Sequence, residues 1–189
     1  MSEILLGLKK DTQKKHDSLE SVSYAKEIMS GQLTLDHYKE LIQKNFLIFS
    51  NIEPFINAQV IIYSALDSFK SLRLADLTAD MTLLSILSPN QESPSLNFEK
   101  DLASTLGVLY VLEGSRLGNK IILNALSSNK ALSSVSDFHF YKQKGISVGG
   151  RWGLFRSKVA KHITTEEDVK RMTIAAKDTF AYFHHTFEK

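Results

Sequence analysis

Residues 98–126 read FEKDLASTLGVLYVLEGSRLGNKIILNAL, and this stretch decides the fold class. Its apolar residues recur three or four positions apart, which places them on one face of a helix. It contains no proline, and no proline follows it anywhere up to residue 189. Because proline in a helix interior breaks the helix, we expect one long apolar helix over 98–126.

Helical spacing continues on both sides of this stretch, and no convincing alternation of a strand is present. Before it, we expect a helix over 3–30 with Gly31 as its C-cap, a second that starts at Thr34 and continues on both sides of Pro54, and a third over 69–87 that ends at the turn Ser88-Pro89-Asn90. After it, we expect a helix from about Asp137 that Gly149-Gly150 interrupts or separates from the next, one over 151–162, and a last one opened by a capping box at residues 164–167. The sequence therefore predicts an all-α, single-domain, multi-helix bundle over residues 1–189.

The amino-acid composition limits which classes of function are open to the protein. The 189 residues are 43% hydrophobic and 23% charged, which is ordinary for one globular domain. The net charge of +2 is too small to indicate nucleic-acid binding, which needs a dense basic face. The absence of cysteine fits a reducing compartment and excludes disulfides, thiolate chemistry and iron–sulfur clusters.

The sequence also predicts a cytoplasmic protein without a membrane segment. No run reaches the roughly 18–20 apolar residues of a membrane span. The N-terminal MSEILLGLKK has an acidic residue before a short apolar run and no cleavage signature, so it does not resemble a secretory signal.

Two glycines, Gly114 and Gly118, lie four positions apart inside the long apolar helix. Each costs roughly 1 kcal/mol of helix stability relative to alanine, and together they clear one helix face of side chains. Either another helix or a flat ligand can then approach that backbone. The glycines also permit a kink, whose exposed carbonyl and amide groups could hold ordered water.

His16 shares a helix face with Thr12 and Leu19, and because that face is apolar we expect His16 to point inward. Glu20 follows one turn later, within reach of the imidazole. A histidine that ligates a metal usually donates its second ring N–H to a carboxylate or carbonyl. The same pattern also fits a partly buried histidine that a helical neighbour satisfies, and the spacing alone favours that plainer interpretation.

Basic residues accompany these features: Lys9, Lys10, Lys14 and Lys15 flank the His16 stripe, and Arg151, Arg156 and Lys158 occur late in the chain. Such charges usually belong to solvated surfaces. However, the two propionates of a haem need cations at a pocket mouth. The combination favours a flat, apolar, anionic ligand, with haem as the leading candidate.

Four segments, in order along the chain, resemble the haem oxygenase family, in particular its bacterial, biliverdin-producing branch. LKKDTQKKH at residues 8–16, followed by Glu20, resembles the proximal helix of that family. YVLEGSRLG at 110–118 resembles its distal helix. Between them, Arg73, Leu77 and Asp80 fit a pattern of the same branch. GRW at 150–152 with FR at 155–156, and AA at 175–176 with TF at 179–180 and Phe183, resemble the last two helices.

The resemblance implies the roles of individual residues. His16 would be the proximal iron ligand, and Glu20 would hold its other ring nitrogen. Gly114 and Gly118 would let the distal helix lie against the haem. Lys9, Tyr110 and Arg156 match positions that contact propionates, and Phe180 matches an aromatic residue at the haem edge.

Three positions depart from the family pattern. Ser115 stands where animal members have an aspartate that organises distal water, although bacterial members also have a small residue there. Asn119 follows the second glycine, where many members have glycine or alanine, so the distal pocket would be tighter or more polar. Gln13 replaces a second propionate-contacting lysine of some members.

The resemblance also implies the chemistry. Haem would be both cofactor and substrate, with no flavin and no zinc, and an external ferredoxin or reductase would supply electrons. The distal helix would direct dioxygen toward one meso carbon, and ordered water with Ser115 nearby would supply a proton. Ring opening would yield biliverdin, carbon monoxide and ferrous iron.

Other functions stay open at this stage. A haem carrier or sensor would share His16 and the cationic rim, and Asn119 keeps that alternative alive. A di-iron helical bundle needs Glu-x-x-His motifs, and the sequence has none. Thiaminase-like relatives of the fold commonly use a cysteine, which is absent.

Overall fold

The computed structural model of the chain describes residues 3–87, 96–142 and 144–189. Within these residues every regular element is helical, which confirms the all-α prediction. The α-helices are α1 (Glu3–Val22), α2 (Ala25–Ser30), α3 (Leu35–Ile62), α4 (Arg73–Leu83), α5 (Leu102–Arg116), α6 (Asn119–Ser128), α7 (Val148–His162) and α8 (Glu166–Glu188), and the short 3₁₀ helices are η1 (Ser64–Phe69), η2 (Lys130–Leu132) and η3 (His139–Tyr141). The expected turn at residues 88–90 lies outside the described residues.

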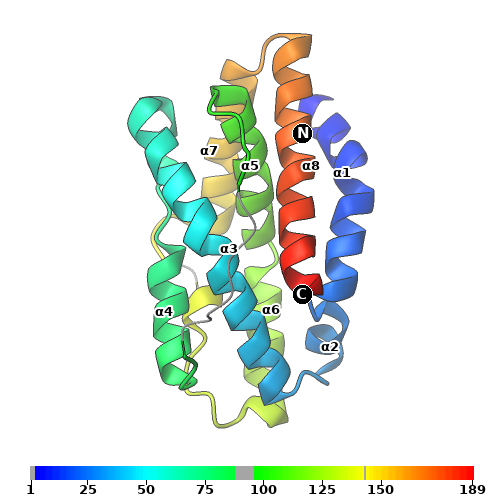
Figure 1. The fold of residues 1–189 in the computed structure, drawn as a ribbon, viewed down its shortest axis with the longest axis vertical. Helices are drawn as coiled ribbons and strands as arrows, with labels where there is room; N and C mark the ends of the chain where they lie inside the picture. The colour runs from blue at the N-terminus through cyan, green and yellow to red at the C-terminus, as the bar shows by residue number, and fades with distance from the viewer. Residues whose placement is uncertain (1–2, 88–95, 143) are drawn as a thin grey trace.

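Helix α8 links the two helices that carry most of the predicted site, because it packs against both α5 and α1 (Figure 1). Helix α5 also packs against α7, and α3 packs against α4. In Figure 1 the chain descends along α1, α5 and α8 alike, so these three helices run in the same direction. A step of one turn along α1 therefore corresponds to a step of one turn along α5.

The close packing of α5 on α8 depends on Gly107. A Cβ at this position would lie 2.3 Å from the carbonyl oxygen of Met172 and 2.9 Å from the Cβ of Ala175. Both distances are shorter than a real side-chain contact, and the carbonyl belongs to the backbone. Glycine is therefore required here by the approach of the two helices.

Gly107→Ala should reduce the free energy of unfolding by roughly 1–3 kcal/mol, because overpacking forces the two helices apart. The matched control is Gly114→Ala on the same helix, since a Cβ at Gly114 would meet no atom within 4 Å. The control should keep or raise the stability, by up to about 1 kcal/mol, because alanine favours a helix more than glycine does. Urea unfolding of both variants measures the difference, and equal effects would contradict the role given to Gly107.

The first helix is shorter than the predicted 3–30. Tyr24 has a positive φ of 59°, which ends the helical path, and α2 starts at the next residue. The Tyr24 hydroxyl donates to Glu40 Oε2 at 2.6 Å, and its ring stacks on His37 at 4.8 Å. These contacts with α3 offset the strain of a left-handed conformation, which is roughly 1–2 kcal/mol. Gly31, with φ of 70°, is the predicted C-cap, but it caps α2.

The apolar stretch 98–126 forms two helices, so the prediction of one continuous helix was wrong. Helix α5 starts after Asp101, whose side chain accepts a hydrogen bond from the backbone N–H of Ser104. At the other end, the N–H groups of Leu117 and Gly118 bond to carbonyls only three residues earlier, at 3.0 and 3.3 Å. This tight turn separates α5 from α6, at the position where the glycine pair permits a kink.

The helix expected from about Asp137 is absent, and only the single turn η3 forms there. The reason lies in α4. The buried carboxylate of Asp80 accepts hydrogen bonds from the N–H groups of His139 and Phe140, both at 2.8 Å. Burial nevertheless raises the pKa of Asp80. Helix α7 begins later, so Gly149 and Gly150 lie in its first turn instead of between two helices.

The remaining predicted boundaries shift by a few residues. The predicted helix over 69–87 is α4, preceded by η1. Thr34 caps α3 as expected, by accepting from the N–H of His37. The capping box of α8 uses Thr165 and Asp168, one residue later than predicted. Within the described part of the chain, no helix is long and apolar enough to cross a membrane.

Candidate functional site

His16 lies on α1 with its side chain 48% exposed, so the expectation that it points into the core was wrong. Thr12, one turn earlier, is buried, and Leu19 is half-buried. The apolar stripe of α1 therefore reaches the surface at His16. One edge of the imidazole contacts the ring of Phe180 on α8, with ring centroids 5.9 Å apart. An exposed histidine beside an apolar ring is accessible to a ligand.

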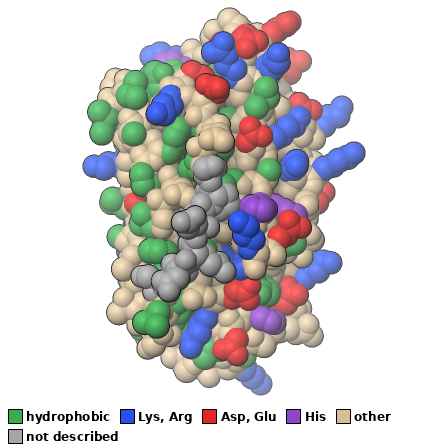
Figure 2. Space-filling model, in the orientation of Figure 1, with side chains coloured by type: hydrophobic (Ala, Val, Ile, Leu, Met, Phe, Trp, Pro, Cys, Tyr) green, Lys and Arg blue, Asp and Glu red, His purple; other side chains and the backbone are tan. Residues whose placement is uncertain are grey.

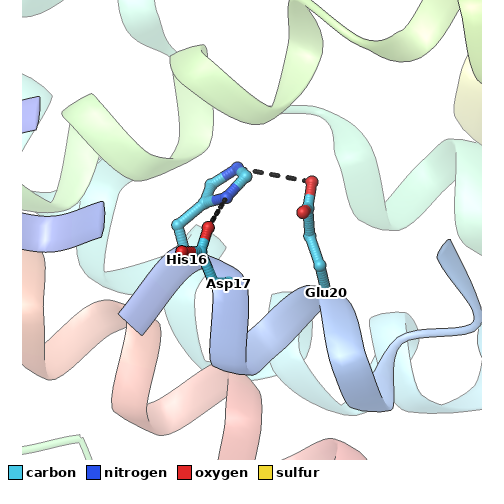
Figure 3. A group of neighbouring side chains, drawn as sticks. All are labelled: His16, Asp17 and Glu20. Carbon is cyan, nitrogen blue, oxygen red and sulfur yellow. Dashed lines mark ion pairs between the residues drawn. The ribbon is translucent and has the colours of Figure 1, made fainter. Parts of the chain in front are cut away.

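Both ring nitrogens of His16 lie near carboxylates, as Figure 3 shows. Nε2 is 3.8 Å from Glu20 Oε1, and Nδ1 is 3.7 Å from Asp17 Oδ1. Both distances exceed hydrogen-bond length, and the contacts are ion pairs only when the imidazole is protonated. The predicted pairing of His16 with Glu20 is thus present in loose form, and Asp17 is a second acidic neighbour. All three side chains are exposed, and such groups are common without a metal.

Gly114, near the end of α5, and Gly118, just before α6, both leave open space beside the backbone. A Cβ at Gly114 would meet no atom within 4 Å, and one at Gly118 would meet only Ile122 and the Ser115 carbonyl, both at 3.8 Å. No described helix therefore packs on this backbone, which disfavours the helix-packing explanation of the pair. Ser115 is exposed, and its hydroxyl donates to the carbonyl of Leu112 at 2.9 Å.

One contact relates α1 to α5. The side chain of Tyr110 on α5 lies beside that of Thr12 on α1: burial raises the pKa of the Tyr110 phenol, and the Thr12 side chain opposes that shift. His16 lies one turn after Thr12, and Gly114 lies one turn after Tyr110. Because α1 and α5 run in the same direction, His16 and Gly114 each lie one turn beyond this contact along their helices.

Aromatic side chains surround this Thr12–Tyr110 contact. The ring of Tyr110 lies 6.1 Å from Trp152 and 6.4 Å from Phe155, both on α7, between ring centroids. Phe155 and Phe180 are buried. Residues of α7 and α8 thus make the surroundings of this contact apolar and aromatic.

The proposed rim cations differ in availability. Lys9 on α1 and Arg156 on α7 are exposed. Arg151, in contrast, donates from Nε to Glu113 at 2.6 Å and from a terminal nitrogen to the Ser68 carbonyl at 2.7 Å, so it is a structural residue. In the view of Figure 2, charged side chains gather over α8 and α1, whereas hydrophobic side chains are scattered over the α3 and α4 side.

The sequence interpretation missed Glu113. It is 3% exposed, and it joins α5 to α7 through Arg151 and lies 3.7 Å from Arg116. The signal was an acidic residue within an apolar helix face, immediately before Gly114.

Asn119 was expected to change the distal pocket, but it is 9% exposed at the first turn of α6. Gln13 donates to Asp17 at 2.7 Å. A surface groove between α2 and α6 contains none of the predicted site residues.

Comparisons with known proteins bear on the family and on the fold. The family model described as heme oxygenase matches residues 2–189. The solved structure of haem oxygenase from Leptospira interrogans is similar to this chain, with a TM-score of 0.78, 16% identity and 98% of each chain covered. At that identity the likeness shows a shared fold. Among curated proteins, none matches the sequence significantly.

Proposed function

The chain belongs to the haem oxygenase family, and from this premise we propose that, as one domain, it cleaves haem with dioxygen and external electrons to biliverdin, carbon monoxide and ferrous iron. The observation that carries the proposal is the placement of an accessible imidazole and a bare glycine face one turn beyond the Thr12–Tyr110 contact. A flat ligand between them would meet a nitrogen donor on one side and backbone on the other.

On the proximal side, His16 ligates the haem iron through one ring nitrogen. Rotation about the side-chain torsions of His16 re-aims the ring, so that one nitrogen can face the iron while a carboxylate accepts from the other. Glu20 is the residue that holds the second nitrogen, because it lies on the same helix face one turn later. Such a partner fixes the tautomer and raises the basicity of the ligand. Phe180 supports the ring and the haem edge.

On the distal side, Gly114 and Gly118 leave space for the haem face and for dioxygen. Ser115 and the tight turn at Leu117 and Gly118 supply polar groups beside that space. Carbonyl oxygens at such a turn hold water that can deliver a proton. The haem itself supplies the chemistry that oxidises its own ring, and the residues of this chain orient it and direct the proton.

At the rim, Lys9, Tyr110 and Arg156 hold the propionates. Arg156→Glu should weaken haem binding only a few-fold, because an exposed ion pair contributes roughly 0–1 kcal/mol. It should change the ratio of biliverdin isomers more strongly, since the propionates set the rotation of the haem. Hemin titration and chromatography of the product measure the two effects. Lys170→Glu, an equal charge reversal at an exposed residue of α8, is the control, and identical behaviour of both variants would make Arg156 an ordinary surface charge.

Electrons come from an external ferredoxin or reductase, and we propose no resident flavin or zinc. The test is turnover under air by the hemin complex with an electron-donor system. We expect the product to absorb as biliverdin and one carbon monoxide to be released per haem. Stable haem binding without ring opening would instead favour the haem carrier or sensor, with Ser115 and Asn119 as the residues to examine.

A further inference from the structure

A small enclosed cavity lies behind the distal helix. It has about 10 Å³ available to the centre of a water-sized particle, which is room for a single small species. Its walls come from α3, α4, α5 and the η1 region, with Phe49, Phe69, Leu109 and Leu112 as the apolar part. Its polar walls are Ser71, Arg73, Glu113, Ser115 and Arg116. The cavity is far too small for haem.

Arg73 is the unusual member of this wall. Arg73 is only 6% exposed, and its guanidinium carbon lies 3.9 Å from the centre of the Phe140 ring. Among the described residues no carboxylate forms an ion pair or hydrogen bond with it; the charges that act on it are more distant. Burial, followed by the like charge of Arg116, lowers the pKa of Arg73 to about 10. A buried cation without a hydrogen-bonded partner is costly.

The carboxylates near the cavity are already engaged elsewhere. Glu113 is bonded to Arg151 and also faces Arg116. Glu53 accepts hydrogen bonds from the Ser71 hydroxyl and the Leu74 N–H. Asp76, whose charge also acts on Arg73 and Arg116, is paired with Lys144. On the walls of the cavity itself, two arginines, Arg73 and Arg116, stand against one acid, Glu113, so positive charge exceeds negative charge there. Water would satisfy the N–H groups of Arg73 but would leave its charge uncompensated.

We propose that this cavity binds one small monovalent anion of the chloride type, held by the guanidinium of Arg73 with Arg116 as a second cation. Room for a single small species favours a monatomic anion over a polyatomic one such as sulfate. Because Ser115 of the distal helix lines the same cavity, the bound anion fixes the back of that helix. The proposal goes beyond haem cleavage, and its test uses the haem-free protein, so its outcome is independent of the proposed activity.

The first measurement is the line width of ³⁵Cl NMR in the presence of wild-type protein. We expect excess broadening that competing bromide removes and that sulfate at equal ionic strength does not. Arg73→Gln should reduce the affinity roughly tenfold or more, since a charge-assisted hydrogen bond contributes about 1.5–3 kcal/mol. Arg171→Gln is the matched control, because Arg171 is an exposed arginine paired with Glu167, and it should retain the broadening. Equal broadening in both variants would overturn the proposal.

The second measurement needs no variant, so it stands even if Arg73→Gln does not fold. Crystals of the wild type grown in bromide should show an anomalous peak within the cavity, beside Arg73. A water molecule there without an anomalous peak would overturn the proposal.

Discussion

Replacement of His16 by alanine is expected to abolish the Soret band of an imidazole-ligated haem. His16 is the accessible nitrogen donor on the α1 side of the proposed site, beside the Phe180 ring. Its side chain is 48% exposed, so its removal leaves no core cavity and should change the free energy of unfolding by no more than about 0.5 kcal/mol. A hemin titration followed by absorption therefore reports loss of the ligand in an intact fold.

His184 provides a demanding control for this experiment. It lies one turn after Phe180 on α8, and its Nδ1 is 3.2 Å from Glu188 Oε2, so it forms a second histidine–glutamate pair near the site. We expect His184→Ala to keep the wild-type spectrum. If His184→Ala lost the band and His16→Ala kept it, the iron ligand would lie on α8 and the proximal assignment would be wrong.

Gly118→Leu should retain haem binding and lose conversion to biliverdin. The structure has space for a side chain at this position, since the nearest atoms to a Cβ are 3.8 Å away. Leucine also favours a helix more than glycine does, so the fold should survive. The added side chain would occupy the space proposed for dioxygen and its ordered water, whereas His16 on the other side would be unaffected. We expect an unchanged ferric Soret band and at least a roughly hundredfold loss of turnover, a misplacement effect of the size that altered reaction geometry produces.

Gly7→Leu is the matched control for Gly118→Leu. Gly7 is also helical, and its Cβ would meet no atom within 4 Å. It precedes His16 by nine residues, or two and a half turns at 3.6 residues per turn, so it lies on the opposite side of α1. This variant should turn over normally. Normal turnover by Gly118→Leu as well would place the distal pocket elsewhere.

The fold class could be predicted because the helical signals are local. The capping threonine of α3, the C-cap Gly31 and the long proline-free segments each act within one helix. The errors came from contacts between distant segments. Asp80 on α4 accepts hydrogen bonds from the backbone N–H groups of His139 and Phe140. No local pattern near residue 137 could reveal these contacts. Tyr24 likewise ends α1 through contacts with α3.

The members of the candidate site stay a prediction from the sequence, whereas the predicted burial of His16 was wrong. Residue spacing placed Thr12, His16 and Glu20 on one face of α1, yet it could not show that this face reaches the surface at His16. The glycine pair predicted that another helix or a flat ligand approaches the backbone at Gly114 and Gly118. Only the structure shows that no described helix covers that backbone. The actual packing glycine is Gly107, which the sequence interpretation passed over because it lies in an uninterrupted apolar run.

Absorption spectra recorded as hemin is added to the wild-type protein, and then as ascorbate is added under air, decide whether this chain binds haem and opens its ring. We expect a Soret band of imidazole-ligated haem that saturates at one hemin per chain, followed by its replacement with the absorption of biliverdin. A hemin signal that never saturates, or a saturated complex whose Soret band returns unchanged after reoxidation, would contradict the proposed function.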